Sequence, residues 1–241
     1  MMQVRGLRKL YKKVTAVDDL SFTVNDGEIF GLVGPNGAGK TTTLKCVCGV
    51  AMPTEGLVLI DDYNLFEQEE EAKRLLAFVP ETPNPYEILT VTEHMKFISL
   101  LYGAEDAEPR IDKLLKAFDL QEKKDDLVNS LSKGMKQKLT ICCALLHNPK
   151  ILLLDEPLIG IDPRGSRTLK DMLIERARNG KSVIISSHML YLVEELCHRI
   201  LIIDHGKKIA EGTLEDIRKM ALASSDASLE DVFLKITEEP P

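Results

Sequence analysis

The sequence predicts an α/β fold in which helices cover a mostly parallel sheet. Three observations support this prediction. From residue 150 onward, short apolar strands alternate with segments of helical length, a pattern typical of parallel sheets. A glycine-rich turn at residues 34–41 joins an apolar strand to a helix. The 241 residues are 44% hydrophobic and 29% charged, the composition of a globular chain that can bury a substantial core.

The first 27 residues are expected to form an antiparallel β region. Residues 2–11 and 16–24 alternate apolar and polar side chains, as half-buried strands do, and a turn follows at 25–27. The elements predicted next are a strand at 28–33, a helix at 42–49, a turn at 53–56 and a strand at 57–60.

A helical region at about 86–148 is predicted to be inserted between the two halves of the sheet. The acidic run at 67–71 is interpreted as a solvated helix face. Prolines at 80, 83 and 85 then interrupt regular structure and indicate a loop. Thr90 and Glu93 have the spacing of a capping box, and Ser132 has the position of an N-cap. The helices expected here are 90–103, 109–118 and 133–147.

The last part of the chain is expected to complete the parallel sheet. Its predicted elements are strands at 151–154, 182–186 and 200–203, helices at 163–179 and 190–197, and a hairpin turn at 204–207. We therefore expect one domain over residues 1–220. Residues 221–241 are assigned as a C-terminal tail, with a loose acidic end at 238–241.

Composition argues against several classes of protein. The net charge of −7 makes a nucleic-acid partner unexpected, since such proteins carry a basic face. No apolar run approaches 18 residues, and no apolar signal segment follows the start. The five cysteines contain no C-x-x-C pair, so we expect buried free thiols in a reducing compartment.

The strongest functional signal is Gly34-Pro-Asn-Gly-Ala-Gly-Lys-Thr41, which matches G-x-x-x-x-G-K-[ST]. With a strand before it and a helix after it, the turn directs backbone N–H groups and a positive helix end at one point, which suits a polyphosphate. The alternative is a turn that binds nothing. Lys40 is expected to reach the β- and γ-phosphates, and Thr41 to ligate Mg²⁺. The predicted nucleotide contacts are Gly34, Pro35, Asn36, Gly37, Ala38, Gly39, Lys40, Thr41 and Thr42.

Two carboxylates follow the apolar strand at 151–154. Ligands bind at the carboxyl ends of parallel strands, the edge where the glycine-rich turn also lies. Asp155 is therefore expected to hold Mg²⁺, and Glu156 to polarise the water that attacks the γ-phosphorus. The alternative, a surface Asp-Glu turn, would prevail if the phosphate loop were absent.

Taken together, residues 2–220 resemble the ATP-binding subunits of ABC transporters, which are built on a P-loop NTPase core. Three further segments and one aromatic residue support the resemblance. Residues 131–135, Leu-Ser-Lys-Gly-Met, resemble the family's L-S-G-G-Q signature. Residues 160–163 resemble its D-loop, and residues 186–188 its switch-histidine segment. Tyr11 lies where the family has an aromatic residue under adenine.

The resemblance implies roles for these residues. Ser132 and Gly134 would face the γ-phosphate bound by another copy, with Asp162 beside them, in a head-to-tail dimer of this chain with itself or with a relative. His188 would contact the γ-phosphate or the attacking water. The simpler alternatives are an N-cap for Ser132, a strand aromatic for Tyr11 and a structural role for His188. The remaining histidines, His94, His147, His198 and His205, are interpreted as structural or exposed.

The sequence also departs from the family pattern. Glu81 stands where the family usually has glutamine; a carboxylate can still approach Mg²⁺, so Glu81 joins Thr41 and Asp155 as a predicted metal contact. Lys133 and Met135 replace glycine and glutamine of the signature.

The function implied by the resemblance is an ATP-hydrolysing motor subunit at the cytoplasmic face of the membrane. It would act on a separate membrane permease, which would dock at the loop at 80–85 and the helical region. The segment 81–93, the signature and residues 228–233 resemble exporter subunits. The alternatives are a soluble ABC-type ATPase acting on ribosomes or DNA, and a nucleotide-binding scaffold without turnover.

Overall fold

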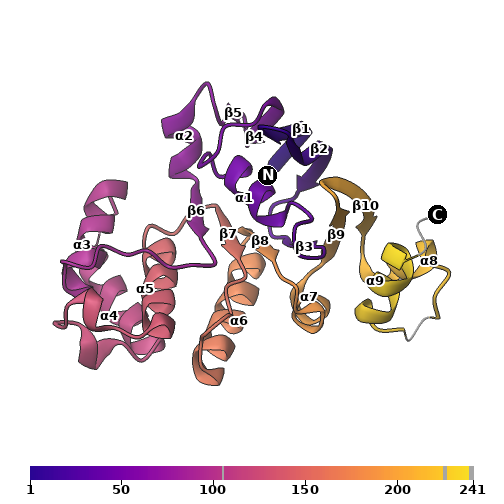
Figure 1. The fold of residues 1–241 in the computed structure, drawn as a ribbon. Helices are drawn as coiled ribbons and strands as arrows, with labels where there is room; N and C mark the ends of the chain where they lie inside the picture. The colour runs from indigo at the N-terminus through magenta and orange to yellow at the C-terminus, as the bar shows by residue number, and fades with distance from the viewer. Residues whose placement is uncertain (105, 225–226, 239–241) are drawn as a thin grey trace.

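Two β-sheets lie on either side of helix α1 (Lys40–Val47) in the computed structural model, which describes residues 1–104, 106–224 and 227–238 (Figure 1). The smaller sheet is antiparallel, with the order β2-β1-β4-β5. Its strands are β1 (Met2–Tyr11), β2 (Val14–Val24), β4 (Glu55–Ile60) and β5 (Tyr63–Asn64). It is the antiparallel N-terminal region that the sequence predicts.

The larger sheet is mostly parallel and has the order β10-β9-β3-β8-β7-β6. Only β10, which pairs with β9 through the predicted hairpin, is antiparallel. Strands β3, β8 and β7 are buried at every residue, because helices and the smaller sheet cover both faces. The strands are β3 (Ile29–Val33), β6 (Leu76–Val79), β7 (Ile151–Asp155), β8 (Ser182–Ser186), β9 (Arg199–Asp204) and β10 (Lys207–Gly212).

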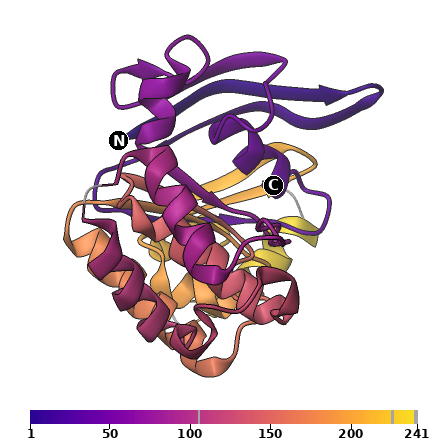
Figure 2. The same cartoon turned by 90° about the vertical axis from the view of Figure 1, so that its left-hand side faces the viewer.

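A block of three helices lies to one side of the larger sheet, as Figure 2 shows from that side. The helices are α3 (Val91–Tyr102), α4 (Ala107–Ala117) and α5 (Lys133–Leu146). The predicted capping box begins α3: the Thr90 hydroxyl accepts from the Glu93 N–H at 3.2 Å, and the Glu93 carboxylate accepts from the Thr90 N–H at 2.8 Å. Helix α2 (Glu69–Arg74) precedes the block and carries the acidic run.

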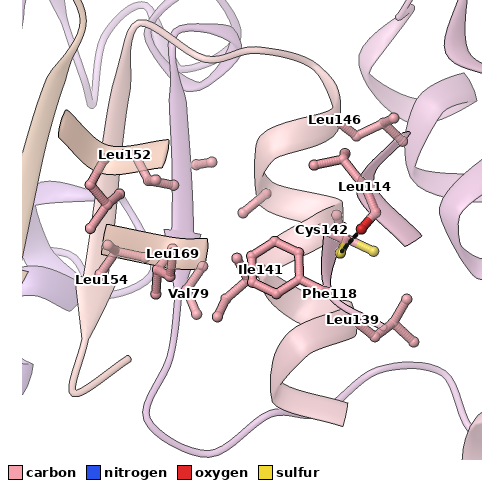
Figure 3. Close-up of a cluster of buried hydrophobic side chains, with 14 of the residues drawn as sticks. Val79, Leu114, Phe118, Leu139, Ile141, Cys142, Leu146, Leu152, Leu154 and Leu169 are labelled. Atoms are coloured by element: carbon pink, nitrogen blue, oxygen red, sulfur yellow. Dashed lines mark hydrogen bonds between the residues drawn. The ribbon is translucent and has the colours of Figure 1, made fainter. Parts of the chain in front are cut away.

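Helix α5 joins this block to the sheet. Figure 3 shows one side of α5 against α4 and the other toward the sheet. Leu139, Ile141 and Cys142 of α5 are fully buried. Their neighbours in the same core include Leu114, Phe118, Val79, Leu152, Leu154 and, from α6 (Pro163–Arg178), Leu169. The inserted helices therefore share one continuous hydrophobic core with the parallel sheet.

The C-terminal part contains two helices that the sequence analysis did not identify, α8 (Leu214–Met220) and α9 (Leu229–Glu238). Leu229, Val232 and Ile236 line one face of α9 and are buried in a core with residues of α7 (Leu190–Leu196) and α8. The segment predicted as a tail is thus packed over much of its length. Of the expected loose end, Glu238 is the last residue of α9, and residues 239–241 lie outside the described part.

The five cysteines are free thiols, as expected. Four are buried and Cys197 is partly buried. Burial raises the pKa of Cys48 to about 11 and the pKa values of Cys143 and Cys197 to about 12. No helix in the described ranges has the length and apolarity needed to cross a membrane.

The buried position of Leu139 gives a first prediction. Because Leu139 is 0% exposed, Leu139→Ala leaves a cavity, and we expect the unfolding free energy to fall by about 2–5 kcal/mol. The matched control is Leu100→Ala in the same helical block, where the side chain is 82% exposed and the expected change is below about 0.5 kcal/mol. Urea unfolding measures both. Equal losses would contradict the packing described for α5.

Candidate nucleotide site

A cavity of about 570 Å³ lies where the parallel strands end. Each of β3, β6, β7, β8 and β9 is followed within two or three residues by a residue that lines it, as expected for a ligand site in an α/β sheet. The lining residues are Val14, Thr15, Ala16, Asn36, Gly37, Gly39, Lys40, Thr41, Thr42, Glu81, Glu156, Ile159, His188 and His205.

The phosphate loop forms one wall of this cavity. Gly37 and Gly39 have φ values of 84° and 105°, which other residues rarely adopt. A Cβ atom on Gly34 would lie 2.3 Å from the Ile203 carbonyl oxygen, so a larger residue would displace the loop. Gly34 and Ala38 support the loop from behind the lining. The first N–H groups of α1 have no partner inside the helix, so they are available to an anion.

Lys40 is held inside the loop. Its Nζ donates to the carbonyl oxygens of Gly34, at 2.6 Å, and Pro35, at 3.1 Å. Burial lowers the pKa of Lys40, while the carboxylates of Glu156, Asp155 and Glu81 act in the opposite direction. The ammonium group thus stands at the cavity wall with acidic groups around it.

Glu156 and His188 are brought together across two strands. The Glu156 carboxylate accepts from the His188 backbone N–H at 2.8 Å, and it lies 2.9 Å from His188 Nδ1. The Ser187 hydroxyl donates to the same carboxylate at 3.3 Å. Glu156 itself is a non-glycine residue with φ 47°, in the left-handed region. The strand end therefore fixes both the backbone and the side chain of Glu156.

Of the three predicted metal contacts, only two line the cavity. Thr41 and Glu81 line the cavity, whereas Asp155 is 1% exposed and accepts a hydrogen bond from the Ser186 hydroxyl. The described ranges contain no group of three or more His, Cys, Asp or Glu residues able to hold a metal ion. This donor set suits Mg²⁺, which keeps several waters and bonds to ligand phosphates, better than an ion that needs a complete protein cage.

Besides Gly34, Pro35, Ala38 and Asp155, which lie close to lining residues in sequence, the predicted residues Ser132, Gly134 and Asp162 lie outside this cavity. The Ser132 hydroxyl caps α5 by accepting from the Met135 N–H at 3.3 Å. A Cβ on Gly134 would lie 2.3 Å from the Gly160 carbonyl oxygen, so this stretch packs directly on the following loop. Asp162 caps α6 and forms an ion pair with the buried Lys138 of α5. Residues 132–134 and 160–162 therefore form one connected surface.

The aromatic residue expected under the base is also outside the lining. Tyr11 ends β1, is 45% exposed, and has Lys9 Nζ 4.8 Å from its ring centre. Val14, Thr15 and Ala16 line the cavity nearby.

His205 is a cavity residue that the sequence analysis did not assign to the site. It is exposed, as expected, but its turn is fixed against the phosphate loop: the Gly206 N–H donates to the Ala38 carbonyl at 2.9 Å. The Asp18 N–H donates to the Gly206 carbonyl at 2.9 Å. The pairing of β9 with β3 places this turn there, and no local motif indicates it.

A second cavity, of about 280 Å³, lies between the proline-rich loop and the helical block. His94 and Cys143 meet inside it, with 3.4 Å between Nδ1 and Sγ. The His147 ring stacks on Tyr102 at 3.9 Å. Large apolar side chains are also exposed here, among them Leu100 and Leu101 of α3 and Ile88 in the loop before α3.

Comparison with known proteins agrees with this geometry. Residues 17–159 match the family model described as ABC transporter. The ABC-type transporter ATP-binding protein EcsA of Bacillus subtilis (strain 168) is 34% identical, over 99% of this chain and 97% of that protein. A Nod factor export ATP-binding protein I of Ralstonia nicotianae is 36% identical, over 88% of this chain and 67% of that protein.

Solved structures show the same fold. An ATP-binding subunit of an ABC transporter superposes with a TM-score of 0.94 at 36% identity, covering 98% of this chain and 99% of that one. The ATP-binding cassette MJ0796, solved as a dimer in a post-hydrolysis state with ADP and Pi, superposes with a TM-score of 0.81 at 26% identity. That match covers 89% of this chain and 99% of the cassette.

The second cavity predicts a pH dependence of stability. Burial lowers the pKa of His94 and of His147 below the ordinary value of 6.5. As the pH falls through 6.5, the unfolded chain therefore binds more protons than the folded chain does. We therefore expect the unfolding free energy to decrease below that pH, down to the folded-state pKa values. His94→Gln with His147→Gln should flatten this slope in urea unfolding measured at several pH values. An unchanged slope would contradict the assignment.

Proposed function

This chain belongs to the ABC transporter family, and from that premise we propose that it hydrolyses ATP in the cavity beside its phosphate loop and transmits the motion to a separate membrane permease. The observation that carries the proposal is the meeting of Lys40 with the Glu156–His188 pair in one cavity. The likeness to a cassette solved with ADP and Pi supports an ATPase.

The proposed roles follow from position. The loop N–H groups and Lys40 bind the phosphates and neutralise charge that develops on them. Thr41, Glu81 and Asp155 would hold Mg²⁺, directly or through water, and the ion would supply positive charge that offsets the charge of the phosphates. Glu156 accepts the proton of the attacking water. His188, whose Nδ1 faces Glu156, has its other ring nitrogen for the γ-phosphate or that water.

We assign the base subsite to the end of β1 and the residues after it. Tyr11 is proposed to stack on adenine, as the family resemblance implies. Its 45% exposure leaves ring surface for a base. His205 lies in the turn between β9 and β10 and lines the same cavity, so it is proposed as a further nucleotide contact.

The complete site requires a second chain. Ser132, Gly134 and Asp162 lie outside the cavity of their own molecule, but they form one surface at the N-terminal ends of α5 and α6. In a head-to-tail dimer, the helix N-terminus at Ser132 would face the γ-phosphate of the partner chain. The dimeric MJ0796 cassette supports this arrangement. The partner would be a second copy or a related subunit.

The permease is proposed to dock at the second cavity and the exposed apolar side chains around it. This places the chain at the cytoplasmic face of the membrane as a peripheral subunit. Export is the proposed direction, supported by the relative named for Nod factor export. Action on ribosomes or DNA remains the alternative function, and the chain's net charge of −7 opposes it.

Removal of the proposed base should separate binding from chemistry. Glu156→Gln keeps the shape of the side chain, so we expect ATP binding to persist while kcat falls by about 10²–10⁴-fold. Phosphate release and titration with labelled ATP measure the two quantities. The control is Glu71→Gln, the same chemical change on the exposed face of α2. Hydrolysis by Glu156→Gln at the wild-type rate would exclude Glu156 as the base.

The docking proposal predicts the effect of surface charges. Ile88→Glu with Leu100→Glu should abolish co-purification with an integral membrane protein, because charged groups would enter an apolar contact, while ATPase activity of the isolated chain is retained. Leu222→Glu, at an 87% exposed position beyond α8, is the matched control. Co-sedimentation with ribosomes, without a membrane partner, would favour the alternative function.

A further inference from the structure

A third cavity, of about 450 Å³, lies between α4 and α6, away from the nucleotide site. It shares no lining residue with the nucleotide cavity. Arg110 and Lys113 of α4 line one side, and Arg176 of α6 and Lys181 line the other. Leu114, Leu145 and Met172 provide apolar lining. The cavity thus combines cationic walls with an apolar surface.

Positive charge is concentrated here in a chain that is acidic as a whole. Four cationic side chains line the cavity with a single carboxylate, Glu175. Within the described residues, the side chains of Glu175 and Lys113 form no hydrogen bond or ion pair with another residue. Burial, followed by the charges of Arg176 and Arg110, lowers the pKa of Lys181. The four cations therefore repel one another, and only one carboxylate of the lining offsets their charge.

Local structure accounts for part of this cluster. Arg110, Arg176 and Lys181 donate to carbonyl oxygens of Leu146, Pro149 and Asn148, at 3.2, 2.6 and 3.0 Å. These carbonyls lie at the C-terminal end of α5 or just beyond it, where cations are favourable. Carbonyl dipoles do not neutralise full charges, however, and at least one N–H group of these cations has no acceptor. Arg176 is only 8% exposed, and its Nε has no hydrogen-bond partner. A buried donor without a partner is costly.

We propose that this cavity binds a small organic anion with at least two negative charges, carried by phosphate or carboxylate groups. Its volume lies in the range of small-molecule sites. Guanidinium groups pair well with both kinds of anion, and the apolar surface suits a short carbon skeleton. The anion would bridge α4 of the helical block and α6 of the core. It would therefore bind at the ends of α5 and α6 opposite to those that carry Ser132 and Asp162.

Calorimetric titration with citrate and with pyrophosphate tests the proposal, on full-length protein saturated with ADP so that the phosphate loop is occupied. We expect saturable binding of one anion. Lys113→Glu should weaken it by about tenfold or more, the loss of one charge-assisted contact. Lys116→Glu, the same change three residues along the exposed side of α4, should have less than about a twofold effect. Both positions are exposed, so both variants should fold.

Four results would overturn the proposal. The first is the absence of saturable binding. The second is equal weakening by Lys113→Glu and Lys116→Glu, which would indicate a general charge effect. The third is binding that disappears when ADP is present, which would assign it to the phosphate loop. Binding of a polyaspartate peptide alone, with neither small anion bound, would indicate an acidic protein segment and would also reject the small-molecule ligand.

Discussion

The close packing of the phosphate loop against its neighbours is the constraint on which the site depends. Gly34 adjoins the Ile203 carbonyl, and Gly39 adjoins the Ala16 carbonyl, at distances that leave no room for a side chain. The turn after β9 is bonded to the loop through Ala38. Both sheets therefore hold one short backbone segment, and its N–H groups need no reorganisation when they meet an anion.

A second set of contacts joins the two regions that are proposed to face another chain. Lys138 of α5 is buried and pairs with Asp162, while Gly134 packs on the Gly160 carbonyl. Because α5 also shares the central core, movement of the helical block would carry the Ser132 surface and the loop before α6 together. In the proposed dimer, this link would connect a contact made at the helical block to a nucleotide held between the two chains.

The sequence predicted best what is determined locally. The capping box at Thr90, the strand Ser182–Ser186 and the glycine-rich turn depend on neighbouring residues, and the structure contains all three. The sequence analysis missed the features that depend on contacts between distant parts of the chain. His205 reaches the cavity through the pairing of β9 with β3, and α9 is buried only because α7 and α8 lie beside it. The ion pair of Lys138 with Asp162 joins residues 24 positions apart, and no local pattern indicates it.

Glu156 has a backbone conformation that is unfavourable for a non-glycine residue, and its carboxylate makes specific contacts with His188. For a residue with a Cβ atom, the left-handed region costs about 1–2 kcal/mol, whereas glycine adopts it freely. A glycine at this position would relax the main chain and erase the carboxylate that meets His188. Relief of the backbone strain at this position would therefore also remove the group proposed to act as the base, so local strain and the proposed catalysis are tied to one residue.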